Sequence, residues 1–367
     1  MIVSIYHVLK YAPSCPPKII KKLGENYTLN ELCSLSFFEL QERGLSTPAI
    51  HYLQQQNWPE VSEDMEWAKL PHHYLINFND PDYPPLLKEI PDPPLLLYGI
   101  GQKELLFTPQ IAIVGTRKPT ANGRETARQF ASALARMGLT ITSGLAAGID
   151  GASHEGALQV KGKTIAILGN GLLHYYPSTH RTLQCQIEKY GLLLSEFSPK
   201  EKPRAAYFPK RNRIISGLSV ATLVVEAATR SGSLITARLA SEQGRDVFAI
   251  PGSIHNPEAR GCHALIKQGA KLIETVDDIL EEIRPLLQRQ FDLSLTVFAE
   301  EEKKAEAIKL EKNLMIILEQ IDYAPTSLEV LIERCAGMKE SLFSSLMQLE
   351  LAGYIVSSGA GYTRLAP

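Results

Sequence analysis

Residues 110–144 read QIAIVGTRKPTANGRETARQFASALARMGLTITSG, and this stretch decides the fold class. It opens with the apolar run QIAIVGTR, which has the character of a buried strand. A helical pattern follows through GRETARQFASALARMG, and a second apolar run, LTITSG, closes the stretch. A strand, a helix and a strand in this order predict a βαβ unit, in which a helix joins two parallel strands.

The same alternation continues along the chain. Five more apolar runs follow, with helical spacing between most of them: TIAILGNG, GLLLSEF, ATLVVEA, DVFAIPG and AKLIET. Near-continuous runs of Val, Ile and Leu indicate strands that are buried on both faces. The sequence therefore predicts an α/β protein with a Rossmann-like doubly wound parallel sheet over about 110–283. The preceding residues 76–101 are dense in proline and predict an irregular leading segment rather than a helix.

Two further regions flank the predicted sheet. Residues 1–68 read as short helices that are interrupted by Pro and Gly. Residues 284–310 are charged and irregular, which predicts a linker. Residues 311–367 predict three helices and then two short strands around SGAG, the order of a winged helix. We therefore expect a helical domain at 1–68, a Rossmann-like domain at 69–283 and a winged-helix domain at 311–367.

The composition narrows the class of protein. The chain has 38 basic and 40 acidic residues, so its overall charge does not favour polyanion binding. No apolar run approaches the roughly 18–20 residues that cross a bilayer, and the N-terminus lacks the basic region and cleavage site of a signal peptide. The five cysteines are scattered and never spaced as CxxC, which favours reduced thiols in the cytoplasm and no structural zinc. Cys262 and His263 beside His255 come nearest to a ligand cluster, and we predict that they bind no metal.

Glycines recur where the predicted strands end. In a doubly wound sheet these positions share one edge, where loops run into helix N-termini and ligands bind. Glycine lets a backbone approach a ligand closely, and free N–H groups with the helix dipole favour an anion. Each glycine could also serve only a tight turn, but as a set they favour phosphate: Gly115, Gly144, Gly148, Gly169, Gly171 and Gly252.

Two common nucleotide sites do not fit this sequence. A dinucleotide site needs GxGxxG after the first strand and an acid after the second, whereas the chain has GTRKPTANG and then Thr142-Ser143-Gly144. The stretch GALQVKGKT resembles a P-loop but has one residue too many between Gly156 and Gly162, and it precedes a strand. We therefore expect neither NAD nor ATP at this edge.

Local charge favours a longer polyanion. Residues 198–213 carry six basic residues and one acid, and the first loop adds Arg117, Lys118 and Arg124. A positive groove lined by glycine amides suits a chain of phosphates better than one nucleotide. Nearby aromatic residues either stack bases or belong to the core, and both readings stay open: Tyr175, Tyr176, Tyr207 and Phe208.

Seven stretches together resemble a known family: IAIVGTRKPT, TSGLAAGIDGASHEGAL, TIAILGNGLLHYYPSTHRTL, LLLSEF, YFPKRNRIISGLS, VVEAATRSGSLITARLASEQGRDVFAIPGS and RGCHALIKQGAKLI. They are similar to the DNA-processing protein A (DprA/Smf) family over residues 70–283, almost without gaps. The resemblance implies that the Rossmann-like domain binds single-stranded DNA, protects incoming DNA, forms a homodimer and loads RecA during natural transformation. It also implies a SAM-like helical domain before the sheet and a winged helix after it.

Matched motif by motif, the resemblance implies specific DNA contacts. They are Gly115, Thr116, Arg117, Gly144, Gly148, Arg181, Lys210, Arg211, Asn212, Arg213, Ser231, Gly232 and Ser233. Thr116 stands where the family more often has serine, and it keeps the hydroxyl. The implied dimer surface covers about 255–275 and includes His263, Leu265 and Leu272.

The stretch AYFPKRNRIISGLS suggests how one part of the site works. Three cations at the start of a helix oppose its dipole, which favours a bound anion. We therefore hypothesise that Lys210, Arg211 and Arg213 neutralise successive phosphates. Asn212 would either fix the loop or touch a base edge.

Two other functions are alternatives to DNA-strand binding. Asp150, His154 and Glu226 could act as acids or bases, but they form no hydrolytic signature, so we expect no enzyme activity and no cofactor. A nucleoside-phosphate hydrolase of similar fold, like the cytokinin-activating enzymes, would need a glycine-rich acid motif that the chain lacks. A regulator that reads DNA through the winged helix is the third possibility, but residues 311–367 hold four basic and seven acidic residues.

Overall fold

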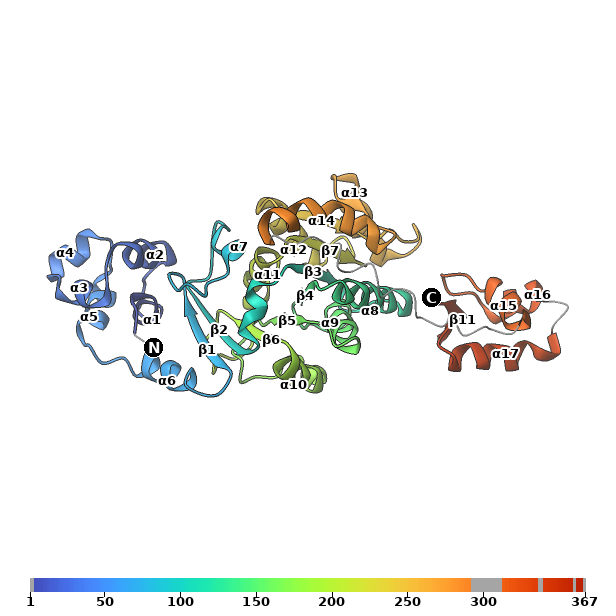
Figure 1. Cartoon of the computed structure of the whole chain (residues 1–367), viewed down its shortest axis with the longest axis horizontal. Helices are drawn as coiled ribbons and strands as arrows, with labels where there is room; N and C mark the ends of the chain where they lie inside the picture. The colour runs from blue at the N-terminus through green and yellow to red at the C-terminus, as the bar shows by residue number, and fades with distance from the viewer. Residues whose placement is uncertain (1–2, 292–311, 336–338, 359–360, 366–367) are drawn as a thin grey trace.

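A nine-stranded sheet forms the centre of the computed structural model, which describes residues 3–291, 312–335, 339–358 and 361–365 (Figure 1). The strand order is β1-β2-β6-β5-β4-β3-β7-β8-β9. The strands are β1 (His73–Asn77), β2 (Leu96–Gly101), β3 (Gln110–Gly115), β4 (Thr140–Ser143), β5 (Thr164–Ile167), β6 (Leu192–Ser195), β7 (Ala221–Val225), β8 (Asp246–Ala249) and β9 (Lys271–Leu272). Strands β3 to β9 pair in parallel, which confirms the predicted parallel sheet and its seven strands.

Helices cover both faces of the parallel strands. They are α8 (Ala121–Arg136), α9 (Ile149–Gln159), α10 (Arg181–Tyr190), α11 (Tyr207–Leu218), α12 (Gly232–Glu242), α13 (Arg260–Lys267) and α14 (Val276–Phe291). Ile111 and Ile113 of β3 pack in a buried cluster with α8, α9 and α14. Ala112 and Val114 point to the other face, into a cluster with α11 and α12. Side chains on one strand alternate between two apolar layers, as a doubly wound sheet requires.

The direction of winding changes between β3 and β7. These two strands are neighbours, but β4 lies beyond β3 on one side and β8 lies beyond β7 on the other. The chain therefore leaves β3 and β7 toward opposite sides of the sheet, although Glu226 still joins the two loops at their carboxyl ends through hydrogen bonds to Thr116 and Thr120. In open α/β sheets such a point leaves a crevice that binds ligands.

The proline-dense segment differs from its prediction. Its two ends are β1 and β2, which pair antiparallel with each other, and β2 pairs antiparallel with β6. Between them lies a single-turn helix, α7 (Pro85–Lys88), and a 3₁₀ turn, η1 (Lys103–Phe107), follows β2. Residues 76–101 thus extend the sheet by a hairpin, because prolines are confined to the connection and the strand LLYGIG is almost fully buried.

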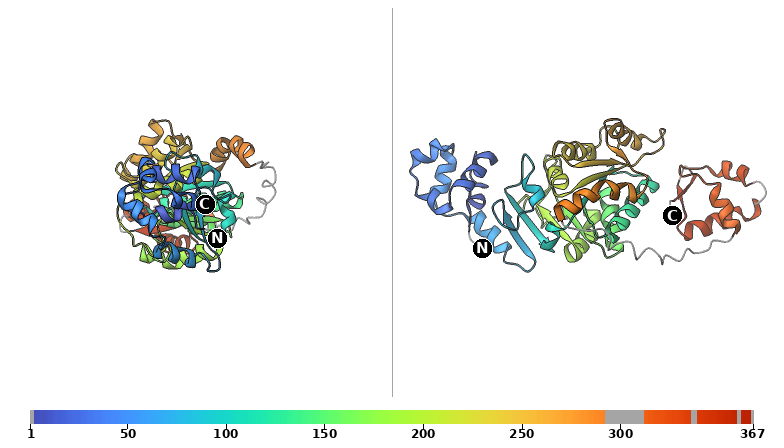
Figure 2. Two further views of the ribbon diagram at one scale, coloured as in Figure 1. Left: turned by 90° about the vertical axis from the view of Figure 1, so that its left-hand side faces the viewer. Right: turned by 45° about the horizontal axis from the view of Figure 1, so that its top comes forward.

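The N-terminal region is a group of short helices at one end of the sheet (Figures 1 and 2). They are α1 (Ile5–Leu9), α2 (Pro17–Asn26), α3 (Leu29–Ser34), α4 (Phe37–Glu42), α5 (Thr47–Gln54) and α6 (Pro59–Trp67). Thr28 and Ser36 begin α3 and α4 with capping boxes, in which the hydroxyl and a glutamate three residues later satisfy backbone N–H groups. Leu9, Leu40 and Ile50 are fully buried and belong to one cluster that continues into the sheet.

The C-terminal region lies at the opposite end of the molecule (Figure 2). It contains α15 (Lys312–Glu319), α16 (Leu328–Arg334), α17 (Lys339–Leu351) and the antiparallel pair β10 (Ile355–Ser358) and β11 (Gly361–Arg364), which confirms the winged-helix order. Residues 284–291 of the predicted linker belong to α14, and residues 292–310 lie outside the described residues. Within the described ranges, no helix is long and apolar enough to cross a membrane.

Candidate nucleic-acid interface

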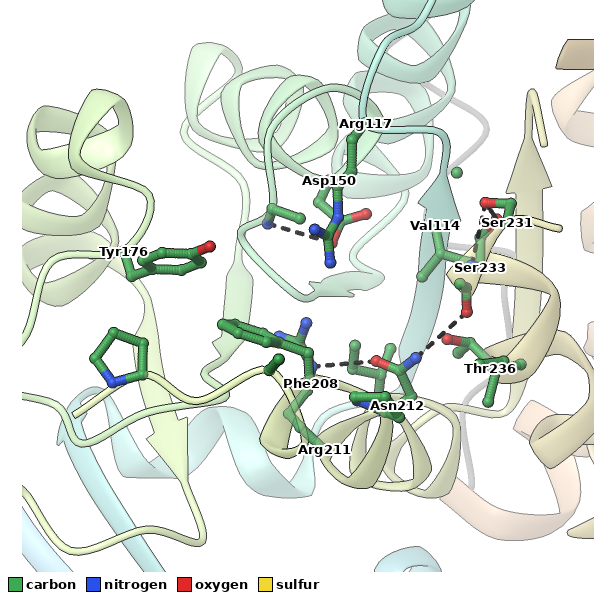
Figure 3. A pocket seen from close by; sticks show the side chains of 18 residues that line it. Val114, Arg117, Asp150, Tyr176, Phe208, Arg211, Asn212, Ser231, Ser233 and Thr236 are labelled. Carbon is green, nitrogen blue, oxygen red and sulfur yellow. Dashed lines mark hydrogen bonds between the residues drawn. The ribbon is translucent and has the colours of Figure 1, made fainter. Parts of the chain in front are cut away.

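A cavity of about 490 Å³ occupies the crevice between β3 and β7 (Figure 3). Its walls come from the end of β3 and the loop after it, the loop before α9, the tyrosine-proline turn, the segment before α11, and the first turns of α11 and α12. The lining residues include Val114, Gly115, Arg117, Asp150, Tyr176, Phe208, Arg211, Asn212, Ser231, Gly232, Ser233 and Thr236. A smaller cavity of about 110 Å³ adjoins it and shares Arg117, Tyr176, Phe208 and Arg211. Sequence-distant predicted residues therefore meet in one place.

One wall of the cavity is aromatic and carries an exposed cation. The rings of Tyr176 and Phe208 lie 5.1 Å apart between centroids, and the Arg117 guanidinium carbon lies 5.9 Å from the Phe208 centroid. Tyr176 is 42% exposed, so its ring can meet a ligand. Figure 3 shows Arg117 pointing from the first loop toward the cavity. A planar cation beside aromatic faces suits both phosphate and base contacts.

The structure also settles the open question about the other tyrosines. Tyr175 is exposed, and the guanidinium of Arg181 lies 5.1 Å from its ring, outside the cavity lining. Tyr207 instead stacks on buried Phe197 at 4.0 Å and donates a hydrogen bond to Glu201. Tyr175 and Tyr176 are therefore surface groups, and Tyr207 supports the loop.

The first loop, residues 116–120, reaches the cavity because two glycines allow its backbone to pack closely against β7 and against the loop before α9. A Cβ at Gly115 would lie 1.9 Å from the carbonyl oxygen of Val225 on the neighbouring strand. Gly148 has a φ of +88°, and a Cβ there would lie 2.3 Å from the Thr116 carbonyl oxygen. Thr116 itself is buried, and its hydroxyl accepts a hydrogen bond from the Lys118 N–H at 3.2 Å. Thr116 therefore shapes the turn and leaves Arg117 exposed.

Arg211 is buried and joins the carboxyl ends of β4 and β5. Its guanidinium donates to the carbonyl oxygen of Gly144 at 2.7 Å and to that of Ile167. A Cβ at Gly144 would lie 2.5 Å from this guanidinium, so the glycine makes room for it. Burial lowers the pKa of Arg211 to about 10, and the nearby charge of Asp150 opposes that shift. Burial raises the pKa of Asp150, and Arg211 in turn lowers it.

Arg213 points away from the cavity. Its guanidinium makes a bidentate ion pair with Glu196 at 2.8 and 2.9 Å, and it also contacts the Asp92 carbonyl at 2.8 Å. Lys210 is half exposed, and its amine lies 3.2 Å from the same Glu196. The hypothesis of three adjacent cations on successive phosphates therefore needs correction, because successive helix positions face different sides and an internal acid neutralises Arg213.

The remaining predicted contacts fall in two places. Asn212 accepts from the Arg211 Nε at 3.3 Å and donates to the Gly232 carbonyl at 3.4 Å, so it ties α11 to the start of α12. Ser231 caps α12 by accepting from the Ser233 N–H, and a Cβ at Gly232 would meet nothing within 4 Å. Gly144 and Gly148 lie in the loop between β4 and α9, and Gly144 lines the smaller cavity. This half of the cavity is polar and open to a ligand.

The candidate acid–base residues are engaged in the fold. Asp150 accepts a hydrogen bond from the Ala146 N–H at 3.3 Å. His154 is fully buried, its Nδ1 lies 2.7 Å from the Thr164 hydroxyl, and burial lowers its pKa to about 3. Glu226 accepts from the N–H and the hydroxyl of Thr120, at the start of α8. Asp150 and His154 are thus separate structural groups, although they stand four residues apart on one helix.

The predicted dimer residues lie on or beside β9, the edge strand of the sheet beyond β7 and β8. His263 and Leu265 are partly buried on α13, and Leu272 is 42% exposed on the short edge strand β9. The Nε2 of His263 lies 3.0 Å from the Gly252 carbonyl oxygen. A cavity of about 630 Å³ beside them is lined by Leu265, Ala270 and Lys271.

Sequence reasoning missed several cavity residues. Pro203, Ile235 and Thr236 are among the lining residues that it did not name, and Glu196, which lies outside the lining, neutralises Arg213. The position of Glu196, directly after the strand LLLS, is the signal that could have suggested a partner for a nearby arginine. Across the described ranges, no group of three or more His, Cys, Asp and Glu residues could hold a metal ion.

Comparisons with known proteins place the chain in a family. The model of a family described as DNA recombination-mediator protein A matches residues 74–284, and the DprA winged helix domain matches residues 301–361. Protein Smf of Escherichia coli is 41% identical over 89% of this chain and 86% of its own length. DNA processing protein DprA of Bacillus subtilis is 47% identical over 57% of this chain and 70% of its own length.

Two solved structures share the fold. The X-ray structure of DprA from Streptococcus pneumoniae has a TM-score of 0.68 and 39% identity, and the match covers 77% of this chain and 99% of that one. DprA from Helicobacter pylori, studied for its single-stranded DNA binding mode, has a TM-score of 0.52 and 32% identity over 60% and 98% of the two chains. On the family models and these relatives, the chain belongs to the DprA/Smf family of DNA-processing proteins.

Proposed function

We propose that this protein binds single-stranded DNA along the carboxyl edge of its sheet and delivers the strand to recombination. The observation that carries the proposal is the convergence of Arg117, Tyr176 and Phe208 on one cavity. An exposed guanidinium can contact a phosphate while the rings stack a base, which is the usual basis of binding without sequence preference. The Helicobacter pylori relative, whose structure concerns single-stranded DNA binding, supports this reading.

The charge around the cavity favours a strand over a mononucleotide. Lys118, Lys202 and Arg124 are exposed, and within the part of the chain that the structure describes they have no acidic partner. Lys200 and Arg204 are exposed too, although each meets a glutamate at about 3 Å. These cations extend beyond one cavity, so they can contact several phosphates of a flexible chain.

The more specific parts of the proposed function come from membership of the DprA/Smf family. We propose that the bound strand is protected, that the chain loads RecA onto it during natural transformation, and that it acts in the cytoplasm as a homodimer. The exposed edge strand β9 and the partly exposed helix α13 supply a surface that a second copy could cover, with His263, Leu265 and Leu272 in it. The domain limits 1–68, 69–283 and 311–367 belong to the same proposal.

Catalysis is not part of the proposed function. Asp150 is the acidic residue among those that line the main cavity, and Arg211 offsets its charge. His154 lies beneath the surface on Thr164. His154 is therefore out of reach of a ligand in the cavity, and Asp150 is engaged by the Ala146 N–H and by the charge of Arg211. Purified protein incubated with nucleoside monophosphates should therefore release no base.

The winged helix is proposed to contribute little to strand binding. Its helix α17 exposes Phe343, Met347 and Leu351 along one side, where a groove-reading helix would carry polar and basic groups. Both described arginines of the domain are engaged internally: Arg334 pairs with Asp322, and Arg364 donates to the Leu318 carbonyl. A chain that ends at residue 291 should keep most of the affinity of the full chain.

A salt-dependent titration tests the proposal. Fluorescence anisotropy should compare a labelled oligothymidine strand, a duplex and thymidine monophosphate as competitor, on one preparation. We expect the strand to bind tightest, with log affinity falling linearly against log salt by about 0.7 per phosphate contact. Equal binding of strand and monophosphate, or binding without salt dependence, would contradict the proposal.

Arg117→Ala and Arg284→Ala form the matched pair for this test. Arg117 faces the cavity, whereas Arg284 is an exposed arginine on α14 that engages no partner in the described structure. Both variants lose one exposed positive charge. Only Arg117→Ala should lower the affinity and the salt slope, because a general charge effect would change both variants alike.

A further inference from the structure

A buried polar cluster joins the N-terminal helices to the sheet domain. The Asp64 carboxylate of α6 accepts hydrogen bonds from the Tyr11 hydroxyl at 2.6 Å, from the Tyr98 hydroxyl, and from the Ser198 hydroxyl at 3.0 Å. These donors come from the end of α1, from β2 and from the segment after β6. Three separate parts of the chain therefore meet on one carboxylate.

Burying the Asp64 carboxylate costs free energy of folding unless every hydrogen-bond partner of the cluster is in place. Asp64 is only 5% exposed, and a buried carboxylate is tolerated where hydrogen bonds and a counter-charge satisfy it. The Lys10 amine donates to the Tyr98 hydroxyl at 2.5 Å and lies 4.1 Å from the centroid of that ring. Burial lowers the pKa of Lys10 to about 8, and the charge of Asp64 opposes this shift. Because the Asp64 carboxylate needs all of these partners at once, the cluster favours one packing arrangement of the N-terminal helices against the sheet.

Ser198 begins the segment that leads to the cavity. Along residues 198–206, the Gly171 N–H donates to the Glu201 carbonyl at 2.8 Å, and the Leu173 N–H donates to the Pro199 carbonyl at 3.1 Å. The segment is thereby joined to the turn that carries Tyr176. Its residues Pro203 and Ala205 line the main cavity directly.

A second contact anchors the same segment from the N-terminal side. The Lys200 amine lies 2.7 Å from the Glu63 carboxylate, one residue before Asp64 on α6. Both groups of this pair are more than half exposed, so the pair contributes little by itself. The bond from partly buried Ser198 to buried Asp64 is therefore the stronger link between the N-terminal helices and the cavity wall.

We propose that Asp64 is a positioning residue for DNA binding: through Ser198 it fixes segment 198–206, and with it one wall of the cavity that faces the strand. The proposal rests on the proposed function, since the cavity must bind DNA for its wall to matter. It assigns the N-terminal helical domain a role in shaping the site from behind, without any contact between this domain and DNA.

Ser198→Ala is the sharpest test, because it cuts the link and leaves Asp64 bound to both tyrosines. We expect single-strand affinity to fall by roughly threefold to tenfold, as for the loss of one hydrogen bond to a charged group. The slope of log affinity against log salt should stay unchanged, because no phosphate contact is removed. Ser62→Ala, on an exposed face of the same helix α6, is the control and should bind like the parent.

Asp64→Ala and the double variant Asp64→Ala with Ser198→Ala complete a cycle. The double variant should bind no more weakly than Asp64→Ala alone, because each change removes one partner of the same Ser198–Asp64 hydrogen bond. Additive losses would overturn the proposal, since they would mean that the two residues act on binding separately. Unchanged affinity in Ser198→Ala would overturn it as well.

Hydrogen exchange separates this proposal from the proposed function. In Ser198→Ala the amides of residues 198–206 should exchange faster than in the parent, while those of α8 and α9 should not change. If the parent binds no DNA, the proposed function fails, whatever the exchange shows. If the parent binds DNA and Ser198→Ala exchanges and binds like the parent, the positioning role alone fails.

Discussion

The first loop and the start of α11 are both rich in cations, but the structure uses them in opposite ways. In the first loop, Arg117 and Lys118 are exposed and, within the described residues, have no acidic partner. At the start of α11, Arg211 and Arg213 are buried and lie against backbone carbonyls and acids of the core. The density of positive charge along a sequence is therefore a poor guide to phosphate contacts. What decides is whether the fold supplies a partner.

The two regions still depend on each other. Arg211 holds Gly144, and Gly144 belongs to the loop that leads to Gly148 and the first-loop contact at Thr116. The buried cations thus build the frame on which the exposed cation is presented. Substitutions in the second region should mainly change the free energy of unfolding, and those in the first should mainly change affinity for DNA.

Arg213→Ala should have the largest effect and should act on stability. It leaves Glu196, whose side chain is 8% exposed, without its bidentate partner. Breaking a buried ion pair costs about 3–5 kcal/mol of unfolding free energy. Chemical denaturation would measure the loss, with Arg238→Ala, an exposed arginine paired with Glu242 at 3.3 Å, as the control. A small loss together with a lower salt slope would place Arg213 with the exposed cations instead.

Arg211→Met should cost somewhat less, about 3 kcal/mol, because two carbonyls lose a donor and Asp150 loses its counter-charge. The pKa of Asp150 is already raised by burial and should rise further in the variant. A carboxyl with a raised folded pKa adds stability at low pH and loses it as pH rises through that pKa. The variant should therefore recover part of its stability when the pH is lowered from neutral toward 3.8, the ordinary pKa of an aspartate. Unfolding experiments over that range that show no recovery would contradict this assignment.

Much of the fold could be predicted from the sequence, because buried parallel strands leave unbroken apolar runs. The hairpin of β1 and β2 was missed, since its strands are separated by a proline-dense connection and pair antiparallel with β6. Gly115 and Arg117 could be assigned to the site because carboxyl ends of parallel strands share one edge. The partners of Arg213 were harder to assign: Asp92 lies 121 residues away and only packing brings it near, whereas Glu196 lies 17 residues away and only its position directly after β6 hints at the pairing.

Arg117→Ala should leave stability unchanged and should change DNA binding. The side chain is exposed and engages one ring, so its loss should alter the unfolding free energy by less than about 0.5 kcal/mol. Single-strand affinity should fall, and the salt slope should decrease by about 0.7 if one phosphate contact is lost. Isothermal titration at several salt concentrations would measure both quantities. If the affinity fell and the slope did not, Arg117 would contact a base and not a phosphate.

Lys210→Ala should have the smallest effect, and it is the variant that lies between the two regions. The Lys210 side chain is 50% exposed and its amine is 3.2 Å from Glu196, so it belongs partly to the frame and partly to the surface. Because Arg213 keeps Glu196 paired when Lys210 is removed, the unfolding free energy should fall by less than about 1 kcal/mol. The amine is already attracted to Glu196, so its loss should also reduce the salt slope by less than the value expected for Arg117. If the same titration showed a slope change equal to that of Arg117→Ala, the amine of Lys210 would leave Glu196 and contact a phosphate when the strand binds. Lys210 would then belong with the exposed cations of the first loop and not with the buried cations of α11.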